Sequence, residues 1–219
     1  MTGFETILDR SDPPVRGYLH RSSVIKDAVV LTHGAGGNAN MGLLVALAEA
    51  FADGGITVLR CDLPFRQERA FGPPRPGQAE RDRAGLKNAV TYIRGLASGR
   101  VFPGGQSYGG RQATMLCAEQ PELADGMLLL SYPLHAPGKP EQLRVQHFPE
   151  LRVPCFFVQG TRDPFGTVEE MRAALKLVAG RTELMTVEDA GHDLGFKGKK
   201  KREDLPGLVV SGFLRFIGA

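Results

Sequence analysis

Continuous apolar runs alternate with helical segments along most of this chain. The runs include "DAVVLTHG" at 27–34 and "GMLLLSYP" at 126–133, and such unbroken apolar stretches are typical of strands buried on both faces. Strands are predicted at 15–21, 27–34, 56–64, 101–107, 126–133, 155–163 and 182–192, and helices at 41–55, 79–97, 108–119, 167–179 and 205–217. This alternation predicts an α/β fold with a mostly parallel central sheet, helices on both faces and right-handed crossovers.

Length and composition favour a single domain over residues 1–219. The sequence is 42% apolar and 23% charged, which is enough apolar material for a sizeable core. The N-terminal stretch "MTGFETILDRSD" contains acidic residues, and no apolar run approaches the roughly 18 residues of a membrane helix. The three cysteines are scattered without a CxxC spacing. We therefore expect free thiols, a cytoplasmic location, no metal site and no membrane association.

The net charge of +3 comes from one short segment. "KGKKKRED" at 197–204 holds five bases and two acids, so the rest of the chain sums to zero. Without a broad basic face, we expect no nucleic-acid partner. The basic run itself is interpreted as a solvated loop, with a small anion-binding patch as the alternative.

Three polar residues follow three different strands of the predicted sheet. Ser107, Asp163 and His192 stand at or just beyond the carboxyl ends of their strands, where ligands bind in sheets of this kind. Ser107 lies in "GGQSYGG", which fits the G-x-S-x-G nucleophile elbow, a sharp turn from strand to helix that exposes the serine hydroxyl. Pro103 stands inside the same strand and predicts a local irregularity there, because proline lacks an amide donor.

The three residues together have the chemistry of a nucleophilic triad. A serine hydroxyl needs a base to remove its proton, and His192 in "DAGHDLG" can serve. A carboxylate must orient that imidazole, and Asp163 in "GTRDPFG" is preferred over Glu169 and Glu170, which fall in the next helix. The structural alternatives are a helix-capping serine, a turn-forming aspartate and an ordinary loop histidine.

The sequence resembles the α/β-hydrolases, and within them the small cap-less branch similar to dienelactone hydrolase. The resemblance rests on "LTHGAGG", "GGQSYGG", "GTRDPFG" and "AGHDLG", in the chain order Ser, Asp, His, and covers roughly 27–217. It implies a serine hydrolase that cleaves a small soluble ester or thioester through an acyl-enzyme, with no cofactor or metal. It also implies an oxyanion hole formed by the amides of Tyr108 and Ala35, with Gly34 and Gly36 as alternatives to Ala35.

The predicted site is open, and its substrate is a small acyl compound. About twenty residues separate the strands at 126–133 and 155–163, which is too few for a lid domain. His135, at the end of the first of these strands, is expected to line the pocket or to serve a structural role. Arg66, with Arg69 and Arg75, is expected either to attract an anionic substrate or to form a solvated loop. We expect a monomer or a homodimer.

Two other classes of function are compatible with parts of the sequence. Gly34-x-Gly36-x-x-Ala39, with Asp62 at the end of the next strand, matches the layout of a dinucleotide-binding fingerprint and would make the protein an oxidoreductase. That interpretation leaves the serine elbow unexplained. The other alternative is a hydrolase-fold scaffold without catalysis, and an intact set of Ser107, Asp163 and His192 argues against it.

Overall fold

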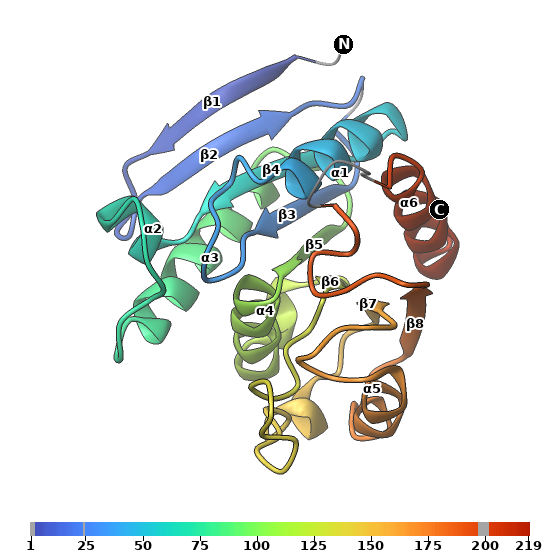
Figure 1. The fold of residues 1–219 in the computed structure, drawn as a ribbon. Helices are drawn as coiled ribbons and strands as arrows, with labels where there is room; N and C mark the ends of the chain where they lie inside the picture. The colour runs from blue at the N-terminus through green and yellow to red at the C-terminus, as the bar shows by residue number, and fades with distance from the viewer. Residues whose placement is uncertain (1–2, 24, 197–201) are drawn as a thin grey trace.

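The computed structural model describes residues 3–23, 25–196 and 202–219 (Figure 1). Within them, one eight-stranded sheet has the order β1-β2-β4-β3-β5-β6-β7-β8. Its strands are β1 Phe4–Asp9, β2 Val15–His20, β3 Ala28–Thr32, β4 Thr57–Asp62, β5 Val101–Gln106, β6 Met127–Leu130, β7 Cys155–Gly160 and β8 Thr182–Val187. The strands β1 and β2 run antiparallel to their neighbours and the others run parallel. The predicted α/β fold with a mostly parallel sheet is confirmed.

Helices cover both faces of the sheet (Figure 1). They are α1 Gly42–Asp53, α2 Pro64–Glu68, α3 Ala79–Arg94, α4 Tyr108–Glu119, α5 Val168–Leu175 and α6 Leu205–Ile217, with short 3₁₀ turns at Pro121–Leu123 and Phe148–Glu150. Side chains of β3 alternate between two cores: Val29 and Leu31 belong to the core that includes α1 and α6, whereas Val30 belongs to the core that includes α3, α4 and α5. The continuous apolar runs reflect this burial on both sides.

Pro103 lies within an unbroken strand, so the predicted irregularity is wrong. β5 is continuous and buried throughout. The amides of Val101 and Ser107 donate toward the β6 side, to Asp125 Oδ2 at 2.8 Å and Leu130 O at 2.8 Å. Alternate residues of a strand face the same neighbour, so the missing donor of Pro103 also faces that side. The pairing with β6 begins only at Gly104, and the ladder therefore tolerates the proline.

The strand order reverses beside β3, and this reversal locates the site. β4 pairs with one edge of β3, and β5 through β8 extend from the other. The loops after β3 and β5 diverge at this point, which is where doubly wound sheets bind ligands. Among the described helices, none is both long and apolar enough to span a membrane.

Candidate active site

Ser107 occupies a strained turn between β5 and α4. Its backbone has φ 52° and ψ −115°, a region that side chains other than glycine rarely adopt. Close approach to β3 explains the flanking glycines: a Cβ on Gly105 would lie 2.4 Å from the Thr32 carbonyl oxygen, and one on Gly109 would lie 2.4 Å from Thr32 Oγ1. The elbow therefore packs directly against the end of β3, and its serine faces the cavity above the sheet.

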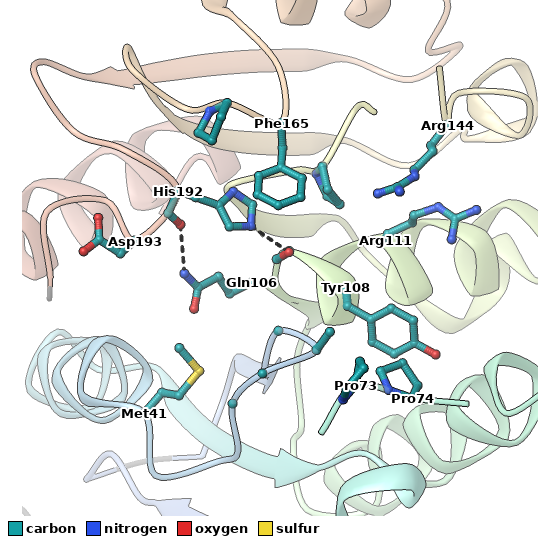
Figure 2. Close-up of a pocket in the computed structure, with 17 residues that line it drawn as sticks. Met41, Pro73, Pro74, Gln106, Tyr108, Arg111, Arg144, Phe165, His192 and Asp193 are labelled. Atoms are coloured by element: carbon teal, nitrogen blue, oxygen red, sulfur yellow. Dashed lines mark hydrogen bonds between the residues drawn. The ribbon is translucent and has the colours of Figure 1, made fainter. Parts of the chain in front are cut away.

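The structure brings Ser107, His192 and Asp163 together. His192 Nε2 lies 2.8 Å from Ser107 Oγ, and His192 Nδ1 lies 2.8 and 3.0 Å from the two Asp163 carboxylate oxygens. Figure 2 shows the imidazole of His192 with its ring nitrogen directed at the serine hydroxyl. An Nδ1–H donated to the carboxylate leaves Nε2 as the acceptor for the Ser107 hydroxyl proton, which is the tautomer a general base requires.

Asp163 is held in place by hydrogen bonds to both of its carboxylate oxygens. Its side chain is fully buried. One carboxylate oxygen accepts the Phe165 amide at 2.9 Å, and the other accepts Gln159 Nε2 at 3.0 Å. The Phe165 ring packs against the imidazole of His192 with centroids 4.2 Å apart. The Asp163 carboxylate and the Phe165 ring together restrict the His192 imidazole to one orientation. Sequence reasoning did not single out Gln159 or Phe165.

The alternative carboxylates have other partners. Glu170 accepts the Thr167 amide at 2.8 Å, and its own amide donates to Thr167 Oγ1, so the pair forms the capping box of α5. Glu169 is exposed and lies 3.9 Å from Arg172. Neither is bonded to His192, and the choice of Asp163 over them agrees with the geometry.

The two amides expected to form an oxyanion hole border the cavity. Tyr108 and Ala35 both line it. Tyr108 is the first residue of α4, so its amide has no partner within the helix. Within the described ranges, neither amide donates a hydrogen bond to another group of the protein. Two unoccupied donors beside a serine hydroxyl are suited to stabilising negative charge on a substrate oxygen.

The side chains of His33 and Asp62 support the loop that carries Ala35. The buried His33 donates from Nδ1 to Gly34 O at 2.8 Å and accepts the Leu63 amide at Nε2. Burial lowers the pKa of His33 and so favours the neutral ring, and the Leu63 amide that donates to Nε2 places the proton on Nδ1. Asp62 Oδ1 accepts the Ala39 amide at 2.7 Å. In a dinucleotide-binding fingerprint this carboxylate would bind a ribose. Here the Asp62 carboxylate instead accepts a hydrogen bond from the loop itself.

Arg66 belongs to this support, and its expected role in binding an anionic substrate is wrong. Its side chain is buried, and its guanidinium donates to the carbonyls of Ala35, Gly37, Arg69 and Gly72 at 2.7–3.1 Å. These bonds use the donors that an anion would need. Arg69 donates to Pro73 O instead of facing the site, and Arg75 is exposed and does not line the cavity.

Tyr108 is fixed at its other end by α3. Its hydroxyl donates to Asp82 Oδ2 at 2.7 Å, and Asp82 Oδ1 accepts the Phe65 amide at 2.9 Å. Asp82 is fully buried, and this burial raises the pKa of its carboxyl. The link ties the first residue of α4 to both α3 and α2. The sequence offered no signal for Asp82, which falls within an ordinary helical pattern.

The cavity in front of Ser107 has a volume of about 840 Å³. Apolar side chains form much of its wall, and two arginines line one part of it (Figure 2). The lining residues include Met41, Pro73, Pro74, Pro133, Pro164, Phe165, Arg111 and Arg144. The expectation that His135 lines this cavity is wrong. His135 is buried, with Nδ1 bonded to Ala136 O and Nε2 3.3 Å from Glu170, which is a structural role.

Other nucleophiles and metal ligands do not compete with Ser107 in the described residues. Cys61, Cys117 and Cys155 are buried, and burial raises the pKa of each thiol. No group of three or more histidine, cysteine or acidic side chains within the described ranges could hold a metal ion. Most of the basic run, 197–201, lies outside those ranges, while Arg202 bonds Asp204.

A serine elbow on the central strand, with acid and base on later strand ends, defines the class of α/β-hydrolase folds. Residues 25–208 match the family described as "Alpha/beta hydrolase domain". The match covers well over half of the chain, and the protein belongs to this family.

Solved structures share the fold at low sequence identity. A dienelactone hydrolase from Anabaena variabilis is 19% identical with a TM-score of 0.76, covering 97% of each chain. Est1E from Butyrivibrio proteoclasticus, solved with ferulic acid, is 17% identical with a TM-score of 0.77, covering 97% of this chain and all of that one.

Curated relatives match only a short segment. A (R)-3-hydroxydecanoyl-ACP:CoA transacylase from Ectopseudomonas oleovorans is 38% identical over 65 residues, which is 30% of this chain. The match spans about a fifth of that transacylase.

Proposed function

We propose that the protein is a serine hydrolase that cleaves a small ester or thioester through an acyl-enzyme on Ser107. The observation that carries the proposal is the position of His192, whose two ring nitrogens lie 2.8 Å from Ser107 Oγ and 2.8 Å from Asp163. A helix-capping serine would not need this arrangement, since the Ser107 side chain makes no capping bond to α4. A scaffold protein would not need it either.

Acylation uses each of these groups, first in the attack on the substrate and then in the departure of its leaving group. Ser107 Oγ attacks the carbonyl carbon of the substrate while His192 Nε2 takes the hydroxyl proton. The carbonyl oxygen becomes an oxyanion that the Ala35 and Tyr108 amides stabilise. The protonated imidazole is balanced by the buried carboxylate of Asp163. His192 then gives its proton to the departing alkoxide or thiolate as the bond to the acyl carbon breaks.

Deacylation repeats these reaction steps with water in place of the Ser107 hydroxyl as the nucleophile. His192 takes a proton from water, the hydroxide adds to the acyl carbon, and the bond to Ser107 Oγ breaks as the serine is reprotonated. The open approach to the cavity supports small substrates, because the connection between β6 and β7 contains only one short 3₁₀ turn. The thioester option is supported by the name of the relatives, (R)-3-hydroxydecanoyl-ACP:CoA transacylase, since an acyl group on CoA is a thioester.

Replacing the nucleophile tests the proposal. In Ser107→Ala, we expect hydrolysis of short 4-nitrophenyl esters to fall by at least about a thousandfold, because attack by the enzyme is lost. The wild-type protein should gain one fluorophosphonate adduct by intact mass, and Ser107→Ala should gain none.

Ser211→Ala, an exposed change on α6, serves as the matched control and should retain full activity and labelling. Thermal melting should show that all three proteins are folded. Activity of Ser107→Ala within tenfold of wild type, or labelling at another residue, would contradict the assignment of Ser107 as nucleophile.

A further inference from the structure

Two arginines line the cavity close to Ser107. Arg111 lies one turn into α4, and its amide donates to Ser107 O at 2.9 Å. Four helical residues rise by about 6 Å, so the side chain of Arg111 projects from the helix just beyond the elbow. Arg144 comes from the connection between β6 and β7. Figure 2 shows both guanidinium groups on one side of the site, with Met41 and Asp193 on the other.

Neither guanidinium has a counter-ion from the protein. Within residues 3–23, 25–196 and 202–219, neither forms an ion pair or a side-chain hydrogen bond, and Arg111 Nε is buried without a partner. Many other arginines of the chain do pair with carboxylates: Arg21 with Glu5, Arg83 with Glu119, Arg94 with Asp125, Arg100 with Asp27, Arg162 with Asp189 and Arg202 with Asp204. Arg66 and Arg69 pair with no carboxylate and donate to backbone carbonyls instead, whereas the side chains of the two cavity arginines do neither within the described residues.

The side chains that lie close to these arginines, Tyr132 and His147, supply no negative charge, and Asp193, which lines the same cavity, lies across it from them (Figure 2). The Tyr132 hydroxyl donates to the backbone carbonyl of Arg144. His147 bonds Thr114, and burial together with Arg111 and Arg83 lowers the pKa of this histidine to about 4, so it is neutral. Burial and the neighbouring Arg111 also lower the pKa of Arg144. Holding two like charges in a partly buried wall without an anion is unfavourable, and a bound anion would remove that cost.

We propose that Arg111 and Arg144 form an anion-binding subsite that selects esters or thioesters carrying a carboxylate or a phosphate. A guanidinium can donate two parallel hydrogen bonds to either group. The position of Arg111 one turn from Ser107 places the anion a short spacer away from the scissile carbonyl. This inference rests on the proposed function for the reaction itself, and it names the substrate class.

Paired substrates that differ only in charge test the proposal. One pair is the 4-nitrophenyl half-ester of glutaric acid and its neutral methyl ester, which place a carboxylate in the acyl part. The other is acetyl-4′-phosphopantetheine and acetyl-pantetheine, which place a phosphate in the leaving group. We expect kcat/KM to favour the anionic member at least tenfold in one pair, and this preference should shrink in 0.5 M NaCl. The pair that shows the preference identifies whether the subsite binds a carboxylate in the acyl part or a phosphate in the leaving group.

Single substitutions assign the preference to the two side chains. Arg144→Gln and Arg111→Gln should each lower kcat/KM for the preferred anionic substrate at least tenfold and for its neutral partner less than threefold. Arg144→Gln lies outside α4 and keeps the test valid if Arg111→Gln disturbs the elbow. Arg172→Gln removes the same charge from an exposed position on α5 and should leave both values unchanged.

A binding measurement separates this proposal from the proposed function. Titration calorimetry of Ser107→Ala with glutarate and with 4′-phosphopantetheine should show binding of one ligand that Arg144→Gln weakens at least tenfold. That result would support the subsite even if the wild-type protein cleaved neither pair. The subsite is overturned if neutral substrates are cleaved as well as anionic ones, if both substitutions affect the two members of a pair equally, or if neither anion binds.

Discussion

At the scale of single residues, Gly109 shows how closely the elbow packs against β3. Its position in α4 is helical, and helix propensity alone predicts that alanine would be more stable by up to about 1 kcal/mol. A Cβ there would lie 2.4 Å from Thr32 Oγ1 and 2.7 Å from His33 O, and no flexible side-chain end can move aside to relieve the contact with the carbonyl. We therefore expect Gly109→Ala to destabilise the protein by about 1–3 kcal/mol, as overpacking does.

Urea denaturation measures this effect, and the chain offers a matched control. A Cβ added at Gly207 in α6 would meet no atom within 4 Å, so Gly207→Ala should be neutral or slightly stabilising. Gly109→Ala should also lower kcat, because the displaced strand end carries His33 and the loop with Ala35. A urea midpoint for Gly109→Ala equal to or above that of the wild type would show that the end of β3 can move to accommodate the added methyl group without loss of stability.

Residue motifs predicted that Ser107, His192 and Asp163 come together, but they did not predict the cationic wall of the cavity. Ser107, Asp163 and His192 each stand in a glycine-containing motif at a strand end, which sequence alone displays. Arg111 and Arg144 have no such motif. The role of an arginine depends on whether a carboxylate lies nearby in space, and that is fixed by packing. Arg66 illustrates the same limit, since its four backbone acceptors come from loops that sequence cannot place.

At the scale of elements, most strands and helices follow from hydrophobic pattern, and two do not. The helices at 108–119 and 205–217 have the predicted bounds. β1 was missed because its side chains are mostly exposed, so it lacks an apolar pattern. α2 was missed because it has five residues and begins at Pro64 within a stretch rich in proline and arginine. Tertiary contacts, rather than propensity, stabilise both elements.

α2 is short, yet it supports the loop that carries Ala35. Arg66 from α2 donates to Ala35 O at 3.0 Å and Gly37 O at 2.7 Å. In Arg66→Met, these bonds are lost and the Ala35 amide is no longer held beside Ser107. We expect kcat to fall about 10- to 100-fold, as for loss of part of an oxyanion hole, with little change in KM. Steady-state kinetics on neutral and anionic esters should show the same loss for both.

Arg66→Lys provides a further check on this positioning role. An ammonium cannot reproduce the planar set of donors that reaches several carbonyls at once, so lysine should not restore kcat. If Arg66→Met instead lost activity only on anionic esters, Arg66 would have the role in attracting an anionic substrate that its sequence position suggested.

At the scale of the whole molecule, pH couples to stability through a histidine at the antiparallel edge of the sheet. His20 on β2 is fully buried and accepts a hydrogen bond at Nε2 from Arg60 Nε, 2.9 Å away on β4. Burial, with the charge of Arg60, lowers the pKa of His20 from 6.5 to about 4. Between these values the unfolded chain binds a proton at His20 and the folded protein does not. The free energy of unfolding therefore falls as pH drops from 6.5 toward 4, by at most about 1.4 kcal/mol per pH unit from this group.

His20→Gln removes this proton-linked term while keeping an acceptor for Arg60. We expect its urea midpoint to decline less than that of the wild type between pH 6.5 and pH 4.5. His135 provides a control of opposite sign, because its bonds to Ala136 O and Glu170 raise its pKa. Its stabilising contribution is present at low pH and is lost as pH rises through the raised pKa, so His135→Gln should make the acid decline steeper. Parallel curves for His20→Gln and the wild type would show that His20 does not set the acid sensitivity of the fold.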